Sequence, residues 1–558
     1  MRAHRWGSWI PLVLLLIFYA GYVLYPVGVM TVESLRSEDG FSLSHYADIL
    51  RGDSSGNLEA AVNSVYVSVL SVVLGGLVGG ALAFCVTQLN FPFRRLVSLL
   101  AVVPVALPPL VGVIAFLFVF GESGILPRLL QAGTGIPSSR VALDGIPAIV
   151  AVHVYSFNTY FFLFVSAALR QTDGSLVDAA AGLGASPSRI LRLVILPGLR
   201  PALLGASILT FMASMASFSA PLLFAGGHRF ITLQIFTTKL NGDLPLAAAL
   251  SLLLTVVSLV FFVTLQLVSG ARITLRRTKG TGRAGILRVH PAVRAILIGL
   301  SALLITLEAL PLVVIVIVSF AREGSWTWQL FPSAYTLENY TRLLGERQIF
   351  EPVLNSSLMG LIALAVVLLV GVAGALLVTK GTLRKGRILW DVVFTLPYAI
   401  PGTVLAIALI LAFNHPTPFS GFRVLVGTFW ILPLAYVLRT YPLMMRSTAA
   451  ALEQLDDGIL EAASSFGAGP WMRFRRIIIP LILPGLVAGG VLTLITLLGE
   501  FVSSVLLYTY ASRPIAVEIL AQLRAYNFGS AAAYCVFLMV LILLVVGTGQ
   551  WILRRRSP

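Results

Sequence analysis

The stretch that decides the fold lies between Glu461 and Pro480. It opens with Glu461-Ala462-Ala463, reaches Gly467 after three more residues, and closes nine residues later on Ile477-Ile478-Ile479-Pro480. Alanines between a carboxylate and a glycine favour a short helix with a small face, and glycine permits a turn that a Cβ would resist. Proline suits the start of a following helix. The stretch therefore predicts two helices joined by a tight turn, in a polar break between apolar spans.

The same pattern occurs a second time, in the first half of the chain. It reads Asp178-Ala179-Ala180, three residues, Gly184, nine residues, then Val194-Ile195-Leu196-Pro197. In both copies the carboxylate precedes the proline by 19 residues, and the copies are offset by 283 residues. A repeat at a fixed offset indicates a duplicated unit. A single helix–turn–helix could be an ordinary connection without a partner, whereas two copies in register favour a shared function.

Composition identifies a membrane protein. Of 558 residues, 58% are hydrophobic and only 11% are charged, and the mean hydropathy is +0.94. A soluble protein of this length could not cover its surface with so few charges, so we predict a polytopic membrane protein. The net charge of +16 lies in short loops between apolar spans, which argues against nucleic acid as a partner. Cys85 and Cys535 lie inside apolar spans and predict packing residues, not a disulfide framework.

Apolar runs of about 20 residues predict twelve transmembrane helices. We predict that the first of them is a membrane helix and not a cleaved signal peptide, because the apolar run to Met30 is long and lacks a small-residue cleavage site. The predicted spans are 9–30, 61–87, 97–120, 146–169, 198–223, 246–269, 292–320, 354–379, 389–413, 422–445, 482–508 and 530–553.

The loops sort by charge into two sides. Twelve spans place both termini on one side, together with both copies of the repeated loop. That side also holds the 270–294 segment, which has seven basic residues and no acid, whereas the 31–60 loop on the other side has six acids against Arg36 and Arg51. Basic loops are retained in the cytoplasm. We therefore predict that both termini and both repeated loops are cytoplasmic.

Further matches between the halves predict two parallel six-span repeats. The first half comprises residues 1–270, a basic cytoplasmic linker comprises 271–291, and the second half comprises 292–558. The matching pairs outside the loop are Asn63-Ser64 with Asn355-Ser356, Pro104 and Pro108 with Pro397 and Pro401, and the segments that begin at Ile231 and Ile515.

The doubled loop resembles the EAA loop, E-A-A-x3-G-x9-I-x-L-P, of the membrane subunits of binding-protein-dependent ABC importers. The resemblance implies an all-α polytopic protein with the type I ABC importer (MetI-like) fold, whose loops 178–197 and 461–480 couple the permease to an ATPase. Asp178 departs from the pattern, in which glutamate is usual. Its shorter side chain implies that the first loop's contact with the ATPase is weaker or differently oriented. The coupling residues so implied are Asp178, Ala179, Ala180, Gly184, Pro197, Glu461, Ala462, Ala463, Gly467 and Pro480.

The resemblance also implies the partners. These are two copies of a cytoplasmic ABC ATPase, which would bind ATP and Mg, and a periplasmic or lipid-anchored substrate-binding protein that docks on the outer loops 31–60 and 321–352. The chain itself has no G-x4-G-K-[S/T] loop, metal-ligand spacing or nucleophile–base pair, so we expect no catalytic residue, cofactor or metal site on it. We expect a multi-pass protein of the bacterial cytoplasmic (inner) membrane that contacts lipid and binds no nucleic acid.

The resemblance also bears on the transported solute. Fused halves resemble the ferric-iron, thiamine and polyamine branch of the family, and Arg513 to Ile519 with Leu523 to Tyr534 look most like ferric-iron permeases. Thiamine, a polyamine or a phosphonate are the alternatives. A secondary transporter driven by an ion gradient is the alternative class, but it would need clustered acids or histidines at mid-membrane. A structural assembly subunit would leave the doubled loop unexplained.

Two intramembrane charges need an account, because such charges are costly. Arg439 lies in the tenth span and Glu500 in the eleventh, and their first-half counterparts are Ser156 and Ser217. Both charges are present in one half and absent from the other, which suggests a pair. However, helix rise along an unbroken span puts them about 15 Å apart in depth, which favours separate roles.

Glu500 is then either part of the translocation path or a structural charge satisfied by its neighbours. Small hydroxyl residues near it suit a polar path or, more simply, close helix packing. Glu308, near Pro311, predicts a kink site that faces protein. The candidate path residues are Ser217, Ser219, Glu500, Ser503 and Ser504.

Overall fold

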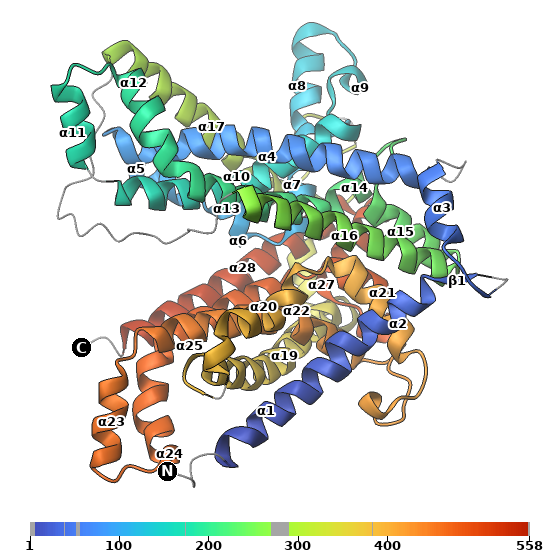
Figure 1. Cartoon of the computed structure of the whole chain (residues 1–558). Coiled ribbons are helices and arrows are strands. Elements are labelled where there is room, and N and C mark those ends of the chain that lie inside the picture. Colours follow the sequence, from blue (N-terminus) through green and yellow to red (C-terminus); the bar gives the residue numbers. More distant parts are fainter. Residues whose placement is uncertain are drawn as a thin grey trace. The chain divides into compact units, whose positions relative to one another are not determined.

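The computed structural model describes residues 6–37, 40–51, 56–172, 174–268, 290–327, 329–381 and 383–555, and these are almost entirely helical (Figure 1). The strands β1 (Arg36–Ser37) and β2 (Gly40–Phe41) form an antiparallel pair, and Ala321 and Tyr335 form an isolated bridge. Residues 271–289 of the predicted linker lie outside the described residues, as do 38–39 and 52–55 of the predicted acidic loop.

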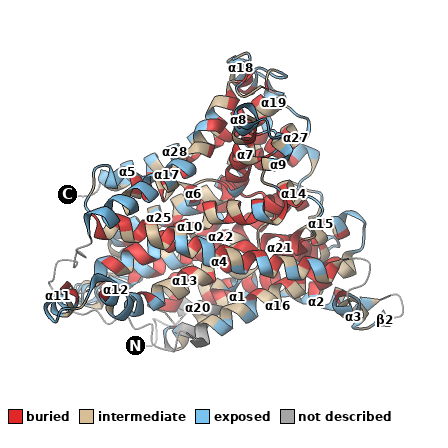
Figure 2. Ribbon diagram, turned by 90° about the horizontal axis from the view of Figure 1, so that it is seen from above, coloured by how far each residue is buried: buried red, intermediate tan, exposed pale blue. Residues whose placement is uncertain are grey.

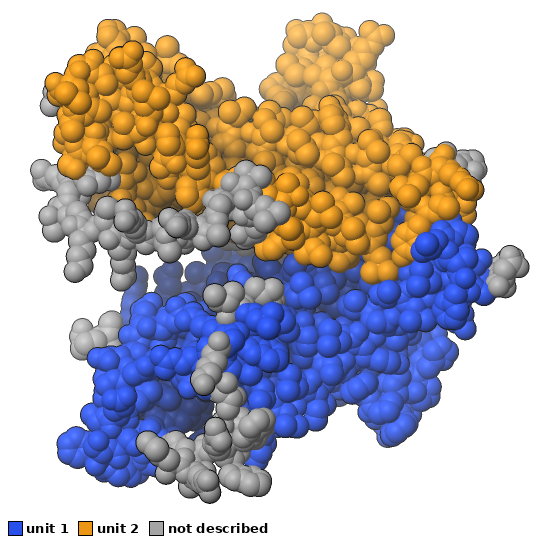
Figure 3. Space-filling model, viewed as in Figure 1, with its two compact units in different colours: residues 1–45, 238–251, 337–558 blue, residues 46–237, 252–336 orange. Residues whose placement is uncertain are grey.

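The chain divides into two compact units (Figure 3). Unit 2 comprises residues 46–237 and 252–336. Its helices are α4 (Asn57–Gln88), α5 (Arg94–Leu100), α6 (Val103–Ala106), α7 (Pro109–Phe120), α8 (Ile125–Thr134), α9 (Ser138–Val141), α10 (Gly145–Gln171), α11 (Gly174–Gly182), α12 (Pro187–Ile190), the π-helical turn η2 (Leu191–Ile195), α13 (Leu196–Met215), α14 (Ser219–Phe224) and α17 (Pro291–Ser319).

Unit 1 comprises residues 1–45, 238–251 and 337–558. The helices α3 (Ser44–Arg51), α15 (Ile231–Leu240) and α16 (Leu244–Val268) are divided between the units. The other helices of unit 1 are α1 (Trp6–Tyr19), η1 (Ala20–Leu24), α2 (Tyr25–Glu33), α18 (Glu338–Gly345), α19 (Arg347–Thr379), η3 (Arg384–Gly386), α20 (Arg387–Ala399), α21 (Gly402–Phe413), η4 (Pro418–Ser420), α22 (Ile431–Glu453), α23 (Asp457–Ser465), α24 (Pro470–Arg473), η5 (Phe474–Ile478), α25 (Ile479–Leu498), α26 (Val502–Leu507), η6 (Tyr510–Ser512), α27 (Ile515–Arg524) and α28 (Phe528–Arg554).

The compact units exchange their first spans relative to the predicted halves. The α1–α2 segment belongs to the first half of the sequence but packs against α19 and α21 of unit 1. There the Tyr19 hydroxyl donates to the Val393 carbonyl at 2.7 Å, and the Tyr22 hydroxyl donates to the Phe419 carbonyl at 2.7 Å. Conversely, α17 packs against α4, α5 and α7 of unit 2. Sequence repeats and compact units are therefore not the same segments.

Among the described residues, ten helices are long and apolar enough to cross a membrane. The pair 389–399 and 402–413 gives an eleventh candidate, bent by 92°. The predicted tenth span, 422–445, corresponds to α22, which begins at Ile431 and continues to Glu453. It does not pass the same hydropathy test, since it carries Arg439, Arg446 and Glu453. Packing on α19, α20 and α25 encloses most of Arg439, whereas Arg446 and Glu453 are exposed.

Several predicted spans are broken, and the predicted boundaries there are wrong. The span at 97–120 is three helices, α5, α6 and α7, and Pro108 and Pro401 occupy equivalent breaks, each preceding the helix that follows it. Proline lacks the amide proton that an unbroken helix needs. The spans at 198–223 and 482–508 also end early, at Met215 and Leu498, and each is followed by a short helix.

Each unit is organised around one closely packed helix pair. In unit 2, α10 crosses α4, and a Cβ on Gly79 would come within 2.1 Å of the Asn158 carbonyl oxygen. In unit 1, α22 crosses α19 in the same way, and a Cβ on Gly371 would come within 2.8 Å of Met444. Small residues at helix crossings let backbones approach closely inside membranes. These two helix pairs support the repeated loops and the helix breaks that are described below.

Candidate functional site

The second copy of the repeated loop is a helix, a left-handed turn and a second helix, as predicted. The helix α23 ends at Ser465, and Gly467 follows with φ of +80°. The Ala468 amide donates to the Ala463 carbonyl at 3.0 Å, and the Gly467 amide donates to the Ser464 carbonyl at 3.0 Å. This bonding pattern is a Schellman turn, which satisfies the last carbonyls of a helix and needs a residue at positive φ.

The first copy has the same turn, bond for bond. Gly184 follows α11 with φ of +78°, the Ala185 amide donates to the Ala180 carbonyl at 3.0 Å, and the Gly184 amide donates to the Ala181 carbonyl at 2.9 Å. Within the part of the chain that the structure describes, no side chain or backbone lies within 4 Å of a Cβ built on either turn glycine. Glycine is therefore needed at both positions for its conformation and not for space.

The second arm of each loop enters its span through a π-helical turn. Leu191–Ile195 precede Pro197 in one copy, and Phe474–Ile478 precede Pro480 in the other. A proline removes one amide donor from the helix, and a widened turn is a usual accommodation. The same irregularity at the same register indicates that the loops are built to one plan.

The carboxylates of the two loops are available to a partner. Asp178 and Glu461 are exposed, and neither takes part in an ion pair within the described part of the chain. Beside the turn glycines, Leu183 is 89% exposed and Phe466 is 92% exposed. Figure 2 shows that most of α11 and α12 is exposed. Leu183 and Phe466 are equivalent by the 283-residue offset, so both loops present a large apolar side chain at the same point.

Among the described residues, ion pairs fasten the base of the second loop but not of the first. Lys380 bonds to the Asp457 carboxylate and donates to the Leu455 carbonyl at 3.0 Å, and Arg384 lies 3.6 Å from Asp457. The hydrogen bond from the Lys380 ammonium holds the pKa of Asp457 below its ordinary value. The first loop has Gly174 at the position of Asp457 and therefore lacks this connection.

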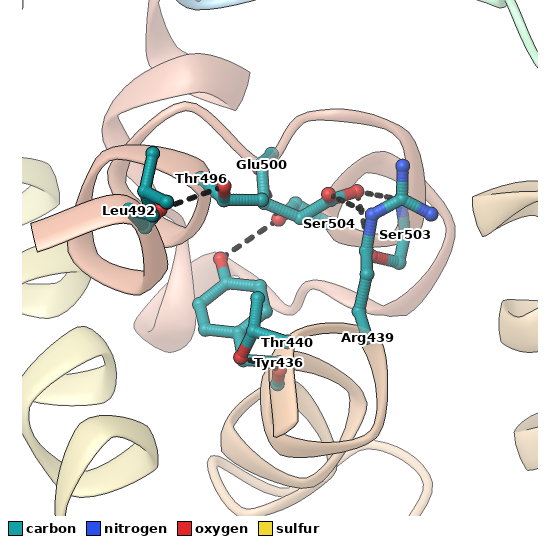
Figure 4. Close-up of polar contacts among 8 residues, drawn as sticks. All are labelled: Tyr436, Arg439, Thr440, Leu492, Thr496, Glu500, Ser503 and Ser504. Atoms are coloured by element: carbon teal, nitrogen blue, oxygen red, sulfur yellow. Dashed lines mark hydrogen bonds and ion pairs between the residues drawn. The ribbon is translucent and has the colours of Figure 1, made fainter. Parts of the chain in front are cut away.

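Arg439 and Glu500 form a direct ion pair, contrary to the separate roles expected from helix rise. Arg439 Nε lies 2.6 Å from Glu500 Oε2, and the Glu500 side chain is only 4% exposed. The expectation failed because it assumed an unbroken span. Here α25 ends at Leu498, and Glu500 lies in the break before α26 (Figure 4). A Cβ on Gly402 would lie 2.9 Å from Arg439 Nη1, so that glycine leaves room for the guanidinium.

The serines beside Glu500 are engaged inside unit 1. The Ser503 amide and hydroxyl donate to Glu500 Oε1 at 3.0 and 2.8 Å. The Ser504 hydroxyl donates to the Glu500 carbonyl at 2.6 Å and pairs with the Tyr436 hydroxyl at 2.8 Å (Figure 4). In unit 2, Ser219 is buried and Ser217 is half-buried. These contacts account for Ser503 and Ser504 by packing, and the path assignment of the five residues stays a prediction.

In each half, the matched Asn-Ser pair is hydrogen-bonded at the start of a later helix, α15 in the first half and α27 in the second. Asn63 Nδ2 donates to the Arg229 carbonyl at 3.1 Å, and the Ser64 hydroxyl accepts from the Ile231 amide at 3.0 Å. The second half repeats both bonds, from Asn355 to the Arg513 carbonyl at 3.2 Å and from the Ile515 amide to Ser356 at 2.8 Å. The sequence repeats quoted above therefore contact one another within each half.

Comparison with known proteins agrees with this geometry. The chain matches the family described as "Binding-protein-dependent transport system inner membrane component" twice, over residues 71–272 and 368–558. The chain belongs to this family. Each match covers one copy of the repeated loop, which confirms the predicted resemblance and the fold class of a helical membrane permease built from two repeats.

Three relatives are informative. A probable ABC transporter permease protein, y4fN of Sinorhizobium fredii, is 31% identical over 89% of this chain and 88% of its own length. The ferric transport system permease protein FbpB of Actinobacillus pleuropneumoniae is 25% identical over 97% of this chain and 77% of its own. The putative 2-aminoethylphosphonate transport system permease protein PhnV of Salmonella paratyphi A is 28% identical over 44% of this chain and 89% of its own.

These relatives establish the chain as the permease component of an ABC importer and a multi-pass membrane protein. Their names differ in the solute, so family membership does not choose between ferric iron and a phosphonate. Sequence reasoning missed the Arg439–Glu500 pair although Gly499, directly before Glu500, signalled a helix end. It also missed the span exchange, for which the sequence carries no signal.

Proposed function

We propose that this permease imports ferric iron, which a substrate-binding protein delivers to its outer face. The relative with the widest coverage of this chain among those described above is a ferric transport permease, which supports the solute. Two cytoplasmic ATPase subunits supply the energy, one at each repeated loop. The observation that carries the coupling role is the doubled Schellman turn, with glycines at φ of +78° and +80° in equivalent loops.

The surface of each loop suits a protein groove. Leu183 and Leu176 lie seven residues apart and are 89% and 58% exposed, and Phe466 and Ile459 lie seven apart and are 92% and 45% exposed. Residues seven apart in a helix share one face. Clustered exposed apolar side chains mark interaction sites, and a short helix can lie in a groove of a partner. Each loop thus offers an apolar anchor with a carboxylate, Asp178 or Glu461, five residues before it.

Movement of the second loop has a direct mechanical route into the membrane. Its π-helical turn leads into α25, a helix of 20 residues and about 30 Å in length. The far end of α25 is the break that holds Glu500, which is tied to α22 by Arg439. Closure of two ATPases on ATP would draw the loops together and shift these breaks, and hydrolysis would reset them. Each ligand acts by favouring one of two conformations.

The loops, the basic 270–294 segment and both termini are assigned to the cytoplasm by the positive-inside rule. The outer loops 31–60 and 321–352 would receive the binding protein. Docking there would favour the outward-open conformation, since a loaded binding protein has more contacts with that state.

Uptake of radiolabelled ferric iron, in cells with and without the gene for this chain, tests the solute. Parallel uptake of thiamine, spermidine and 2-aminoethylphosphonate controls for the other branches of the family. We expect iron uptake alone to be lost without the gene and restored by the intact chain. Unchanged iron uptake with loss of another solute would replace iron while keeping the importer, and no change in any solute would contradict the proposal.

A further inference from the structure

A buried carboxylate in α17 has no hydrogen-bond partner among the described residues. Glu308 is 6% exposed and lies within Pro291–Ser319, a helix apolar enough to cross a membrane. Neither Glu308 Oε1 nor Oε2 has a hydrogen bond within the described part of the chain. An ionised carboxylate without compensation is too costly in such surroundings. Some positive charge must therefore accompany it.

Its neighbours on α10 are also incompletely bonded. The Glu308 carboxyl lies against the Asn158 side-chain amide, and the Tyr155 hydroxyl is within electrostatic range of it. Asn158 is fully buried, and its Nδ2 is already used, donating to the carbonyls of Val154 at 2.9 Å and Tyr155 at 3.0 Å. Asn158 Oδ1 and the Tyr155 hydroxyl have no partner within the described residues.

The packing around these side chains supports the same placement. Ile305, one turn from Glu308, belongs to the same buried cluster as Phe162, one turn from Asn158.

The helices α4, α5 and α7 pack against α17. Their titratable groups are Glu59, Tyr66 and Cys85 on α4 and Arg94 and Arg95 on α5, and Cys85 contacts the Leu297 carbonyl, three turns from Glu308. On α10, His153 Nδ1 contacts the hydroxyls of Ser71 and Ser214 at 3.1 and 2.9 Å, and its Nε2 has no partner among the described residues.

Glu308 Oε1 and Oε2, Asn158 Oδ1 and the Tyr155 hydroxyl are thus four buried oxygen atoms without a hydrogen-bond partner in the described part of the chain. Of these, only the Tyr155 hydroxyl carries a hydrogen. One proton on Glu308 would satisfy the set, because the acid could donate to Asn158 Oδ1 and accept from Tyr155. One small monovalent cation would satisfy it as well, because carboxylate, amide and hydroxyl oxygens are ligands for hard cations. Both solutions add one positive charge.

The fold does not require this arrangement, because the other half lacks it. At the 283-residue offset, Leu438 replaces Tyr155 and Tyr441 replaces Asn158. In unit 1, Tyr441 packs edge-on against Phe18 with ring centroids 5.5 Å apart. That contact is aromatic and carries no charge, so the polar group in unit 2 is a feature added to one half.

We infer that Glu308, Asn158 and Tyr155 form a buried binding site for one positive charge, supplied by a proton or by a sodium-sized cation. The site is independent of which solute the permease carries. Its occupant stabilises the packing of α17 against unit 2, because an empty site leaves an uncompensated charge.

The test uses the full-length protein in detergent and compares two readouts. Thermal unfolding is followed in NaCl, KCl and choline chloride, and infrared spectra at neutral pH are searched for the carbonyl stretch of a protonated acid. If sodium is the occupant, the Tm rises with NaCl to a plateau in the parent protein and is independent of NaCl in Glu308→Gln. Tyr155→Phe, which loses one ligand, raises the half-saturating NaCl concentration about tenfold.

If a proton is the occupant, the Tm does not respond to NaCl, and the parent protein shows an acid carbonyl band that Glu308→Gln removes. Glu346→Gln, which changes an exposed carboxylate paired with Arg342, is the matched control and should alter neither readout. Absence of both the sodium response and the acid band in the parent protein would overturn the inference. That decisive comparison needs no variant, so a folding defect of Glu308→Gln cannot obscure it.

Discussion

At the scale of single residues, the two turn glycines have the most clearly defined task. An L-amino acid with a side chain in the left-handed region costs about 1–2 kcal/mol. Gly184→Ala and Gly467→Ala should therefore each destabilise their loop by about that amount and reduce transport, with insertion into the membrane unchanged. Transport and limited proteolysis of the loops measure the effect.

Each loop supplies its own matched control for the glycine prediction. Gly182 lies two residues before the first turn and Gly469 two after the second, and both have open space around the Cβ position and a negative φ. Gly182→Ala and Gly469→Ala should be close to the parent protein. Equal effects at all four glycines would contradict a role for the left-handed turn.

The Arg439–Glu500 pair gives a second prediction at this scale. Removing one member of a buried pair strands the other charge, so Arg439→Ser or Glu500→Ser should each cost about 3 kcal/mol. The double variant reproduces Ser156 and Ser217 of the first half, and it should be more stable than either single variant. Unfolding of the four proteins forms a double-mutant cycle.

The exposed pair Arg342–Glu346, 3.0 Å apart, is the control for that cycle. Its coupling should not exceed about 1 kcal/mol. A coupling of the same small size for Arg439 and Glu500 would show that the intramembrane contact is not what holds the break at Glu500.

At the scale of elements, the Asn-Ser pairs explain how α15 and α27 are held at their first residues. Ser356 and Ile515 are both buried, so Ser356→Ala leaves a buried amide without an acceptor, at a cost of about 1–3 kcal/mol. Hydrogen exchange at the start of α27 should quicken. As a control, Thr548→Ala removes an exposed hydroxyl bonded within its own helix and should leave that exchange unchanged. Unchanged exchange in Ser356→Ala would contradict a role for the Ser356–Ile515 hydrogen bond in holding α27.

Elements also show where prediction from sequence succeeded. The two-arm loops and their glycine turns were predicted correctly because the signals are local, an alanine-rich helix and a glycine that ends it. The spans containing Pro104, Pro108 and Gly499 were predicted as continuous because apolar composition persists through the breaks. The Arg439–Glu500 contact was then missed, since its geometry depends on the break after Leu498.

At the scale of the whole molecule, two repeats in sequence were predictable from fixed offsets, and the family match over 71–272 and 368–558 confirms them. The exchange of first spans was not predictable. An apolar helix such as α1 or α17 can pack on either unit, and only contacts such as Tyr19 with Val393 decide between them.

The central claim is that one chain carries two equivalent docking loops for ATPase subunits. Native mass spectrometry of the complex purified through a tag on this chain tests it most directly. We expect two ATPase copies per permease chain, one copy in Leu183→Ser or Phe466→Ser, and none when both are changed. Phe41→Ser, 76% exposed on the predicted outer side, should keep two. A single copy, or none, on the intact parent chain would contradict the account.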